Sequence, residues 1–347
     1  MRIALDATPL TLTSGGLARY TSELACALQS EFPDDDVLLL SDQPFTAPPG
    51  VRAGARPRNR LERLWWTAGL DLELSRQHAD LFHGTNFSVP YLARRPAVMS
   101  VHDLSPWMDP SWHHAAARVR RRTPVLIGLG LAAMILTDTE AVRRQVIERW
   151  RLHPDRVASA PLAASSLFHP VRAEPPAPYF LFTGTLEPRK NVRALIDAWR
   201  SVRARRDVEL WLAGRRRADF PELEPQPGLR LLGEVPDTEL PRLYSGAIAF
   251  VYPSAYEGFG LPVLEAMQCG ACVIASQDPA LREVSGGGAI HVDLPQLSTA
   301  MLTVIDEPGL RREMQARAAE RAAEFSWNRT ARLTRAVYDE GFRRFHA

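Results

Sequence analysis

The sequence predicts an α/β protein with two doubly wound parallel sheets that face each other across a cleft. Short apolar runs alternate with amphipathic stretches twice along the chain, as in parallel strands connected by helices. A proline-rich segment, residues 161–178, separates the two series and is typical of a linker. The length of 347 residues is that of about two domains. Ligands of such sheets bind beyond the carboxyl ends of the strands, so motifs at those ends are the functional candidates.

The first series of apolar runs starts at the beginning of the sequence. Five strands are expected, at residues 2–7, 37–40, 81–83, 98–101 and 134–137. Helical patterns follow some of them, for example at residues 17–29 and 140–150. These elements predict a first domain over residues 1–170.

The second series begins directly after the linker. Strands are expected at residues 179–183, 209–213, 230–232, 248–252 and 272–275. Helices are expected at residues 192–203, 238–245, 262–268 and 309–324. Ser326 can cap a last helix over residues 327–345. We therefore expect a second domain over residues 171–326, with a C-terminal helix within 327–347 that crosses back to the first.

The composition excludes several classes of protein. The net charge is +2 with the two signs interspersed, so a nucleic-acid partner receives no electrostatic support. No apolar run reaches the ~18 residues of a membrane-spanning helix, and residues 1–6 resemble a strand more than a signal peptide. Cys269 and Cys272 form a C-x-x-C pattern that no second ligand pair completes, so they are expected to be core residues. A cytoplasmic protein is expected.

The chain contains 41 arginines and a single lysine, Lys190. Arginine replaces lysine easily on a surface but not where a compact ammonium must reach a buried anion. Lys190 lies between an expected strand that ends at Gly184 and an expected helix that Asn191 can cap. The amides at the helix start, together with Arg189 and Lys190, predict a phosphate site. The alternative is an exposed basic turn.

A second motif, residues 257–267, follows another expected strand. Gly258 and Gly260 permit close approach of the backbone to a ligand, and the helix that follows offers its first amides to an anion. Glu257 lies in the loop, and Glu265, one turn into the helix, is expected to point towards the same ligand. Ionised carboxylates accept hydrogen bonds, which suits a ligand rich in hydroxyl groups. The alternative for Glu265 is a favourable contact with the helix dipole.

Two further candidates belong to the first domain. His102 ends an expected strand at the cleft, where a functional role is favoured over a structural one. The Ser14–Gly15–Gly16 turn lies between the first strand and the first helix and is not a dinucleotide fingerprint. By contrast, His113 and His114 are expected at the surface, and Asp138–Thr139 is expected only to cap a helix.

Other charged stretches favour surface roles. The acidic run at residues 34–36 precedes a strand, so a solvated turn is favoured over a metal site. No metal is expected. Basic and aromatic residues at 58–66 and 118–122 fit either peripheral contact with anionic lipid or partly packed surface.

These motifs together resemble the retaining glycosyltransferases of family four, which have the GT-B fold of two Rossmann-like domains. The residues that carry the resemblance are Gly-Thr-Leu-Glu-Pro-Arg-Lys-Asn at 184–191 and Glu-Gly-Phe-Gly-Leu-Pro at 257–262, with a second glutamate at 265. The resemblance covers nearly the whole chain, from the glycines at 15–16 to the Phe-Ser-Trp junction at 325–327.

The resemblance implies a role for each candidate. Glu265 would bind the ribose of a nucleotide and Glu257 the transferred sugar. Arg189 and Lys190 would neutralise a diphosphate, His102 would lie against donor sugar and acceptor, and Gly16 would approach the diphosphate from the acceptor-binding first domain. The backbone of the phosphate site would come from Gly184, Gly258, Phe259, Gly260 and Leu261.

The implied reaction is the transfer of a hexose from a nucleotide diphosphate sugar, with GDP-mannose as the preferred donor. The acceptor would be a glycan or a lipid-linked glycan, as in polysaccharide and lipopolysaccharide biosynthesis. A UDP-sugar donor, a sugar-nucleotide epimerase, a pyridoxal-dependent phosphorylase and a non-catalytic nucleotide-sugar-binding subunit remain as alternatives. The chain also departs from the family: Thr185 replaces a frequent arginine, and residues 161–165 and 283–287 lack family features.

Overall fold

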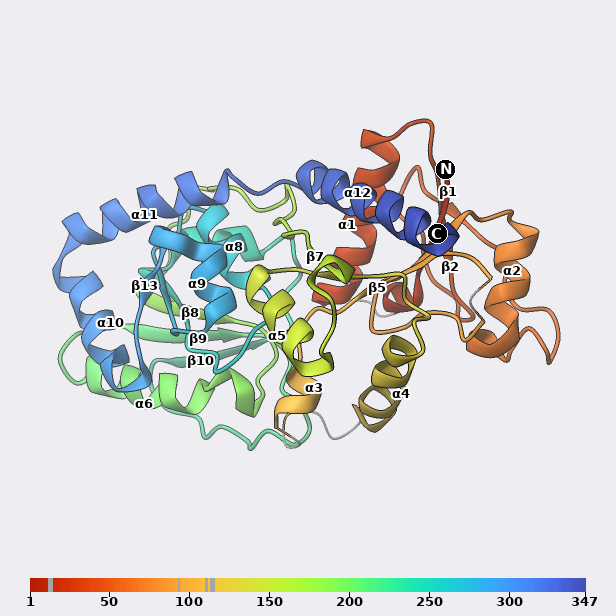
Figure 1. Ribbon diagram of the computed structural model, residues 1–347. Helices are drawn as coiled ribbons and strands as arrows, with labels where there is room; N and C mark the ends of the chain where they lie inside the picture. The colour runs from red at the N-terminus through yellow and green to blue at the C-terminus, as the bar shows by residue number, and fades with distance from the viewer. Residues whose placement is uncertain (12–14, 93, 110–111, 113–115) are drawn as a thin grey trace. The chain divides into compact units, whose positions relative to one another are not determined.

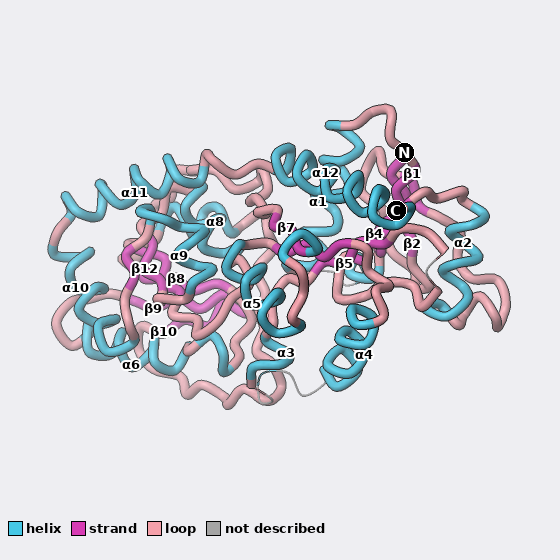
Figure 2. Tube along the Cα trace, in the orientation of Figure 1, coloured by secondary structure: helices cyan, strands magenta, loops and turns pink. Residues whose placement is uncertain are grey.

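A computed structural model describes residues 1–11, 15–92, 94–109, 112 and 116–347 (Figure 1). The chain divides into two units, the first formed by Met1–Leu162 with Ser326–Ala347 and the second by Ala163–Phe325. This division falls inside the proline-rich segment 161–178, which contains neither helix nor strand. In each unit helices surround a central sheet (Figure 2).

The sheet of the first unit has seven strands within the described residues, in the order β3-β2-β1-β4-β5-β6-β7. All neighbouring strands are parallel. The strands are β1 (Arg2–Asp6), β2 (Asp36–Leu40), β3 (Arg52–Ala53), β4 (Leu81–Gly84), β5 (Ala97–Ser100), β6 (Met134–Thr137) and β7 (Val157–Ser159). Every residue of β4, β5 and β6 is buried, because helices cover both faces of a parallel sheet.

The sheet of the second unit repeats this topology, with six described strands in the order β10-β9-β8-β11-β12-β13. Its strands also run parallel. They are β8 (Tyr179–Thr183), β9 (Glu209–Ala213), β10 (Leu229–Gly233), β11 (Ala249–Tyr252), β12 (Val273–Ala275) and β13 (Ile290–His291).

The helices bury one apolar stripe each. In α6, residues Leu195, Ile196, Trp199 and Val202 are buried at helical spacing. The first unit has α1 (Gly16–Glu31), α2 (Leu70–Arg76), α3 (Ser105–Met108), α4 (Ala117–Gly128), α5 (Glu140–Trp150) and α12 (Trp327–His346). The second has α6 (Val192–Arg203), α7 (Leu240–Gly246), α8 (Leu261–Gln268), α9 (Pro279–Ser285), α10 (Leu297–Asp306) and α11 (Pro308–Ala322).

The prediction of two doubly wound parallel sheets is confirmed. The strands that sequence reasoning did not name are the short edge strands β3, β7 and β13. Both residues of β3 are exposed, and β13 has only two residues, so neither leaves an apolar run to recognise.

The strand orders place a topological switch point in each sheet. From β1 the chain adds β2 and β3 on one side of β1, and it then returns to add β4 on the other side. The second sheet repeats this path: β9 and β10 lie on one side of β8, and β11 lies on the other. Helix connections on opposite sides diverge at such a point, which leaves room for a ligand beyond the carboxyl ends of the two central strands. The candidate residues of the second unit follow β8 and β11.

Helix α12 joins the C-terminus to the sheet of the first unit. Its cap is as expected, because the side chain of Ser326 accepts a hydrogen bond from the amide of Arg329. The helix packs along α1, and Arg335 forms an ion pair of 2.5 Å with Asp35. Tyr338 is buried, and its hydroxyl lies 2.7 Å from Nδ1 of His83 in β4. The C-terminal helix is thus held by polar contacts as well as apolar packing.

The structure corrects one sequence interpretation here. Residues 34–36 were expected to form a solvated turn, but Asp35 is only 8% exposed and pairs with both Arg335 and the N-terminal ammonium group. Asp36 opens β2 and pairs with Arg2 and Arg52. The acidic run therefore ties the chain ends to the sheet.

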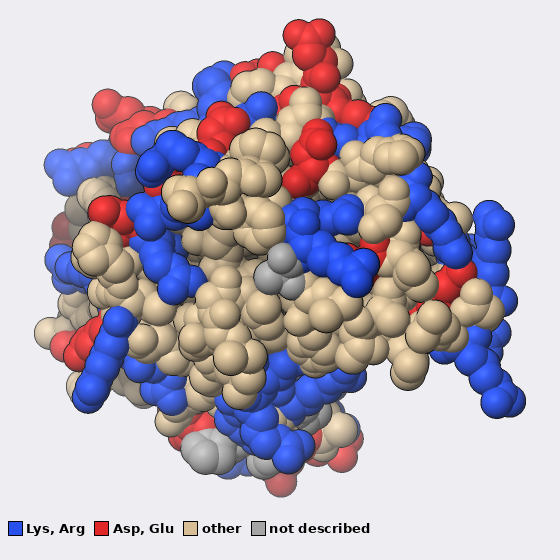
Figure 3. All heavy atoms as spheres, turned by 45° about the vertical axis from the view of Figure 1, so that its right-hand side comes forward, with Lys and Arg blue, Asp and Glu red and all other residues tan. Residues whose placement is uncertain are grey.

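Surface charge and helix length agree with the composition. On the face drawn in Figure 3, basic and acidic side chains are interspersed around uncharged areas. None of the helices in the described part of the chain is long and apolar enough to cross a membrane.

The contact between Tyr338 and His83 gives a test of α12 docking. Burial lowers the pKa of His83 to about 3, so the ring is neutral and needs its hydrogen-bond partners. Replacing Tyr338 by Phe removes one partner, and we expect a loss of about 1–2 kcal/mol in the free energy of unfolding, measured by urea denaturation. Phe342→Leu, at an exposed position of α12, is the control and should change little. Equal stability of Tyr338→Phe and wild type would show that this bond contributes nothing to docking.

Candidate active site

The candidate residues of the second unit gather where β8 and β11 end. These strands are hydrogen-bonded neighbours, with Phe180 opposite Ala249 and Leu181 opposite Phe250. The segment after β8 begins at Gly184, and the segment after β11 leads through Glu257 to α8. Both therefore emerge at the switch point of the sheet, as the sequence motifs predicted.

The segment after β8 is fixed to the segment after β11 by two hydrogen bonds. A short 3₁₀ turn, Pro188–Lys190, precedes α6. The carbonyl of Arg189 accepts a bond from the amide of Ala255, and Nδ2 of Asn191 donates to the carbonyl of Pro253. The expectation that the Asn191 side chain caps α6 is wrong: Asn191 adopts left-handed backbone geometry, and its amide is used to join the two loops.

Lys190 is buried and paired. Its side chain is 9% exposed, and its Nζ lies 2.5 Å from Oε1 of Glu257. The same ammonium donates to the hydroxyl of Tyr252, the last residue of β11, and lies 4.8 Å from the centre of its ring. The alternative of an exposed basic turn is excluded, because the lysine sits in an enclosed polar site.

Arg189 extends this pair into a chain of alternating charges. Its guanidinium contacts Glu257 at 3.1 Å and Glu187 at 2.8 Å. Glu187 in turn accepts from Arg217 at 3.1 Å. We call these five residues, Glu187, Arg189, Lys190, Arg217 and Glu257, the charge cluster. Arg217 also forms an ion pair of 2.5 Å with Asp219, so the three cations of the cluster face three carboxylates, two of which belong to it.

Sequence reasoning missed three members of this arrangement. Glu187 lies in the same motif as Arg189, and Arg217 follows the carboxyl end of β9, the neighbour of β8. Tyr252 is the final residue of β11. All three satisfy the rule that functional residues follow strand ends, so that rule could have found them.

The electrostatics of the cluster favour an ionised Glu257. Burial would raise the pKa of Glu257, but Arg189 and Lys190 lower it to about 2. Burial lowers the pKa of Lys190, while Glu257 acts in the opposite direction. Burial also raises the pKa of Tyr252, which keeps the phenol protonated and able to donate. The site thus holds fixed charges in a place with little water, where they act strongly on a ligand.

Glycines set the backbone around the cluster. Gly184 has a φ of 131°, and an added Cβ there would meet nothing nearer than 3.9 Å. Gly260 has a φ of 93° at the N-cap of α8, and a Cβ there would lie 2.3 Å from the side chain of Leu281. Open space beside Gly184 permits close approach of a ligand, whereas Gly260 is required for packing and for the turn into the helix.

The remaining residues of the second motif are placed by α8. Phe259 and Leu261 have buried side chains, and the ring of Phe259 packs edge-on against Phe325. Gly258 follows Glu257 in the loop. The amide of Glu257 donates to Asp278, which caps α9. The loop is therefore anchored from both the sheet and the next helix.

Glu265 lies deeper than its expected position towards the ligand. It is 2% exposed, and its carboxylate accepts a bond of 3.1 Å from the hydroxyl of Tyr244. The same hydroxyl lies 2.6 Å from Oγ1 of Thr183, the residue before Gly184. Glu265 thus reaches the carboxyl end of β8, but through buried hydrogen bonds rather than from an exposed surface.

His102 belongs to the first unit and follows β5. Its Nδ1 lies 2.8 Å from a carboxylate oxygen of Asp138, and its Nε2 lies 2.7 Å from the carbonyl of Thr85. The carbonyl of Thr85 and an ionised Asp138 are both acceptors, so these two contacts favour the doubly protonated ring, although burial raises the pKa of Asp138. Burial lowers the pKa of His102, but the charge and hydrogen bond of Asp138 outweigh burial and raise it. Both ring nitrogens are thus committed within this unit.

The structure separates two residues that were expected to share one role. Thr139 caps α5, because its side chain accepts from the amide of Val142. Asp138 does not act as the cap and binds His102 instead. Tyr20 of α1 packs edge-on against His102, with ring centres 4.6 Å apart. Asp138 and Tyr20 are therefore the neighbours that hold His102, and the strand-end position of Asp138 after β6 was the available signal.

Other expectations for the site have different outcomes. Gly16 is the exposed first residue of α1, while Ser14, His113 and His114 lie outside the described residues. Cys269 and Cys272 are buried free thiols, as expected, and burial raises the pKa of both. Among the described residues no group of three or more histidine, cysteine or carboxylate side chains is placed to hold a metal.

Comparisons with known proteins cover both units. The model for Glycosyltransferase Family 4 matches residues 14–163, and the model for Glycosyl transferases group 1 matches residues 167–322. The O-antigen chain mannosyltransferase B of Escherichia coli is 35% identical over 282 residues, which are 74% of each chain.

Two other proteins show how far the similarity extends. The serotype-specific mannosyltransferase WbdA of Escherichia coli is 29% identical over 61% of this chain and 29% of its own length, so this chain spans only part of that relative. The structure of sucrose-phosphate synthase from Thermosynechococcus elongatus superposes with a TM-score of 0.74 at 18% identity, over 97% of this chain and 98% of that one. This likeness shows the GT-B fold. The two family models and the E. coli relative show that the chain belongs to the family 4 (group 1) glycosyltransferases.

Proposed function

We propose that the chain is a retaining hexosyltransferase that transfers mannose from GDP-mannose to a hydroxyl group of a glycan or lipid-linked glycan, without a metal. The observation that carries this proposal is the buried charge cluster at the switch point of the second sheet. The mannose assignment is supported by the name of the E. coli relative, an O-antigen chain mannosyltransferase.

In the proposed reaction the charge cluster stabilises the leaving group. The bond between the sugar C1 and the diphosphate oxygen breaks, and negative charge grows on the diphosphate. Lys190, Arg189 and the amides at the start of α8 provide the compensating positive charge that a metal supplies in other enzymes. Arg217 adds to it through Glu187.

Glu257 changes partners in this proposal. In the ligand-free chain its carboxylate neutralises Lys190 and Arg189. When the diphosphate binds, the two cations gain a second anion, and Glu257 becomes available to accept hydrogen bonds from sugar hydroxyls. Glu265, after a change of partner from Tyr244, would accept from the ribose. The glycines at 16, 184 and 258 allow backbone approach to the phosphates.

Retention is explained by attack on the face from which the diphosphate leaves. The acceptor oxygen forms a bond to C1 as the bond to the diphosphate breaks, and the acceptor proton passes to the departing phosphate oxygen. Hydrogen bonds to Asp138 and Thr85 fix the ring of His102 in place. In this proposal the ring contributes a positive charge near sugar and acceptor, and its two hydrogen bonds hold the loop after β5.

We place the reaction in the cytoplasm, with peripheral contact to the membrane at most. The three free cysteines fit a reducing compartment.

The donor and the stereochemistry are tested directly by turnover. Incubation with GDP-mannose and a mannose-terminated glycan should yield an extended product whose new anomeric linkage has the α configuration of the donor, read by NMR. Activity should persist in EDTA. Calorimetry with GDP, UDP and dTDP should show tightest binding of GDP. Tighter binding of UDP would contradict GDP-mannose as the donor. An inverted linkage would contradict the retaining mechanism, and loss of activity in EDTA would show that the reaction needs a metal.

The lysine is tested by conservative exchange. In Lys190→Arg the broader guanidinium does not fit between Glu257 and Tyr252, and in Lys190→Ala the charge is lost. We expect kcat to fall about 10²-fold in both variants, since each removes a preorganised cation from the leaving group. Arg193→Lys, at an exposed position of α6, is the control. Thermal unfolding of each variant establishes that it is folded. Full activity of a folded Lys190→Arg would show that the ammonium is not specifically needed.

The charge on His102 predicts a pH dependence. A raised pKa means that the imidazolium is fully present at low pH and is lost as the pH rises through the pKa of the folded protein. Asp138→Asn removes the main stabilising charge, so His102 should lose its proton at lower pH, followed by NMR of the ring. The alkaline limb of kcat/KM should move to lower pH in the same variant. Asp34→Asn, in an exposed turn, is the control. A shifted NMR titration with an unchanged rate profile would exclude a role for the charge.

A further inference from the structure

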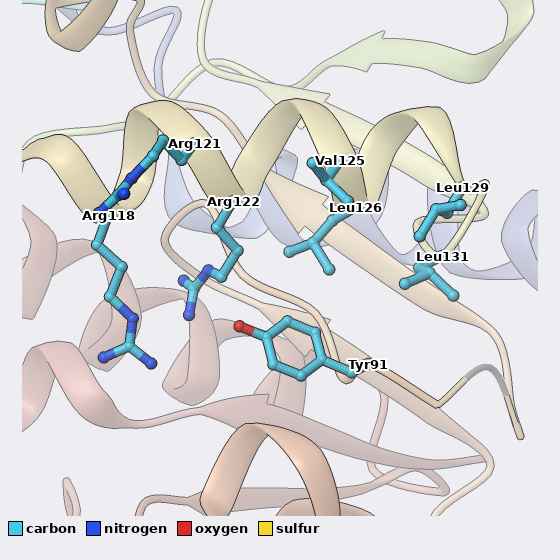
Figure 4. Close-up of a pocket in the computed structure, with 8 residues that line it drawn as sticks. All are labelled: Tyr91, Arg118, Arg121, Arg122, Val125, Leu126, Leu129 and Leu131. Carbon is cyan, nitrogen blue, oxygen red and sulfur yellow. The ribbon is translucent and has the colours of Figure 1, made fainter.

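A surface pocket of about 400 Å³ lies on the first unit between α4 and the loop that follows β4. Its walls are three arginines of α4, four aliphatic residues at and beyond the end of that helix, and Tyr91 of the loop (Figure 4). The size is within the range of pockets that hold small ligands. The charge cluster belongs to the second unit, so this pocket is distinct from it.

One end of the pocket is cationic. Arg118 and Arg122 are four residues apart on α4, and Figure 4 shows both guanidinium groups on the same side of the helix, with the Tyr91 hydroxyl turned towards Arg122. Within the described residues no carboxylate forms an ion pair with Arg118, Arg121 or Arg122. Asp6 attracts Arg122 at longer range, so Arg118 and Arg121 supply the positive charge that favours an anionic ligand.

Arg122 is held in place for such a contact. Its guanidinium donates to Oγ of Ser88 and lies 5.1 Å from the centre of the Trp66 ring. Its Nε is buried and has no hydrogen-bond partner within the described residues. The bond to Ser88 and the stacking on Trp66 hold the Arg122 guanidinium in one orientation, which preorganises it for a phosphate group.

The other end of the pocket is apolar. Leu126, Leu129 and Leu131 line it, together with Val125. Val125 and Leu129 are 57% and 69% exposed, the latter the most exposed large apolar side chain in the described chain. From Arg118 to Leu129 the distance along the helix axis is about 16 Å at 1.5 Å per residue. Solvent exposure of adjacent apolar side chains beside a cationic site indicates a ligand that covers both.

We propose that this pocket binds the lipid-phosphate part of the acceptor: the phosphate ester contacts the arginines, and the hydrocarbon chain lies along Leu129 and Leu131. The inference rests on the proposed function, which it deepens by assigning a lipid-linked rather than a free glycan acceptor. Inorganic phosphate alone would contact only the arginines and would leave the apolar half of the pocket without a ligand contact. Tyr91 lines the side of the pocket opposite α4, and the pocket is otherwise open to solvent.

Binding is tested with dodecyl phosphate below its micellar concentration, by calorimetry without donor or acceptor. Arg118→Gln and Leu129→Ser should each weaken binding about tenfold, since one removes a charge-assisted contact and the other apolar contact area. Arg144→Gln on α5 and Leu333→Ser on α12 are the matched controls at exposed positions and should bind as wild type does. Inorganic phosphate and dodecyl maltoside should each bind at least tenfold more weakly than dodecyl phosphate.

Turnover then relates the pocket to the acceptor. With a mannoside linked to dodecyl phosphate, the two pocket variants should raise KM about tenfold and leave kcat unchanged, while a lipid-free mannoside should show no difference between variants and wild type. Because the calorimetry requires no transfer, an inactive protein that binds dodecyl phosphate through these residues would reject the proposed function and retain the pocket.

Three results would overturn the inference. Equal binding of dodecyl phosphate to wild type, Arg118→Gln and Leu129→Ser would show that the lipid phosphate does not use this pocket. Inorganic phosphate that binds as tightly as dodecyl phosphate would reduce it to an anion site. Binding to phosphatidylglycerol vesicles without binding to monomeric dodecyl phosphate would make the same residues a contact for the membrane surface.

Discussion

The buried contact of Glu257 with Lys190 and Arg189 is the constraint on which the candidate site depends. Removing any one of the three side chains would leave a buried charge without its partner, which is strongly destabilising. The contact therefore fixes the loop after β8 against the loop after β11. It also keeps two cations at the strand ends, where a diphosphate can exchange with the carboxylate. The same three side chains therefore stabilise the fold and supply the charge for the proposed reaction.

The topology of the sheet makes this contact possible. The order β10-β9-β8-β11-β12-β13 makes β8 and β11 neighbours, although 65 residues lie between the end of β8 at Thr183 and the start of β11 at Ala249. Their parallel direction brings both following loops to the same edge. Arg217 arrives from β9 at that edge as well. The cluster is thus assembled from three neighbouring strand ends, with three charges after β8 and one each after β9 and β11. Hydrogen bonds of Asn191 and Ala255 hold the loops in register.

The first unit uses the same principle with a different result. His102 follows β5, Asp138 follows β6, and Thr85 follows β4, so three adjacent strand ends bond one imidazolium. Behind it, Tyr20, Ser100, His83 and Tyr338 form a buried chain of hydrogen bonds that ends on α12. The C-terminal helix is therefore part of the support of His102. On the outer surface of this unit, α4 instead presents arginines beside exposed apolar side chains.

The sequence by itself determined the two parallel sheets, the motifs at the ends of β8 and β11, and the presence of the single lysine in the first of these motifs. These depend on local patterns: apolar runs of four or five residues, glycines at turns, and residue types that have no equivalent substitute. Only the tertiary structure decided which groups meet. In the folded protein Lys190 pairs with Glu257, and Asn191 joins the two loops. Asp138 pairs with His102, and Asp35 pairs with Arg335. The physical reason is that a buried charge must be compensated by a neighbour in space, and neighbours in space are set by strand order, which no local pattern records.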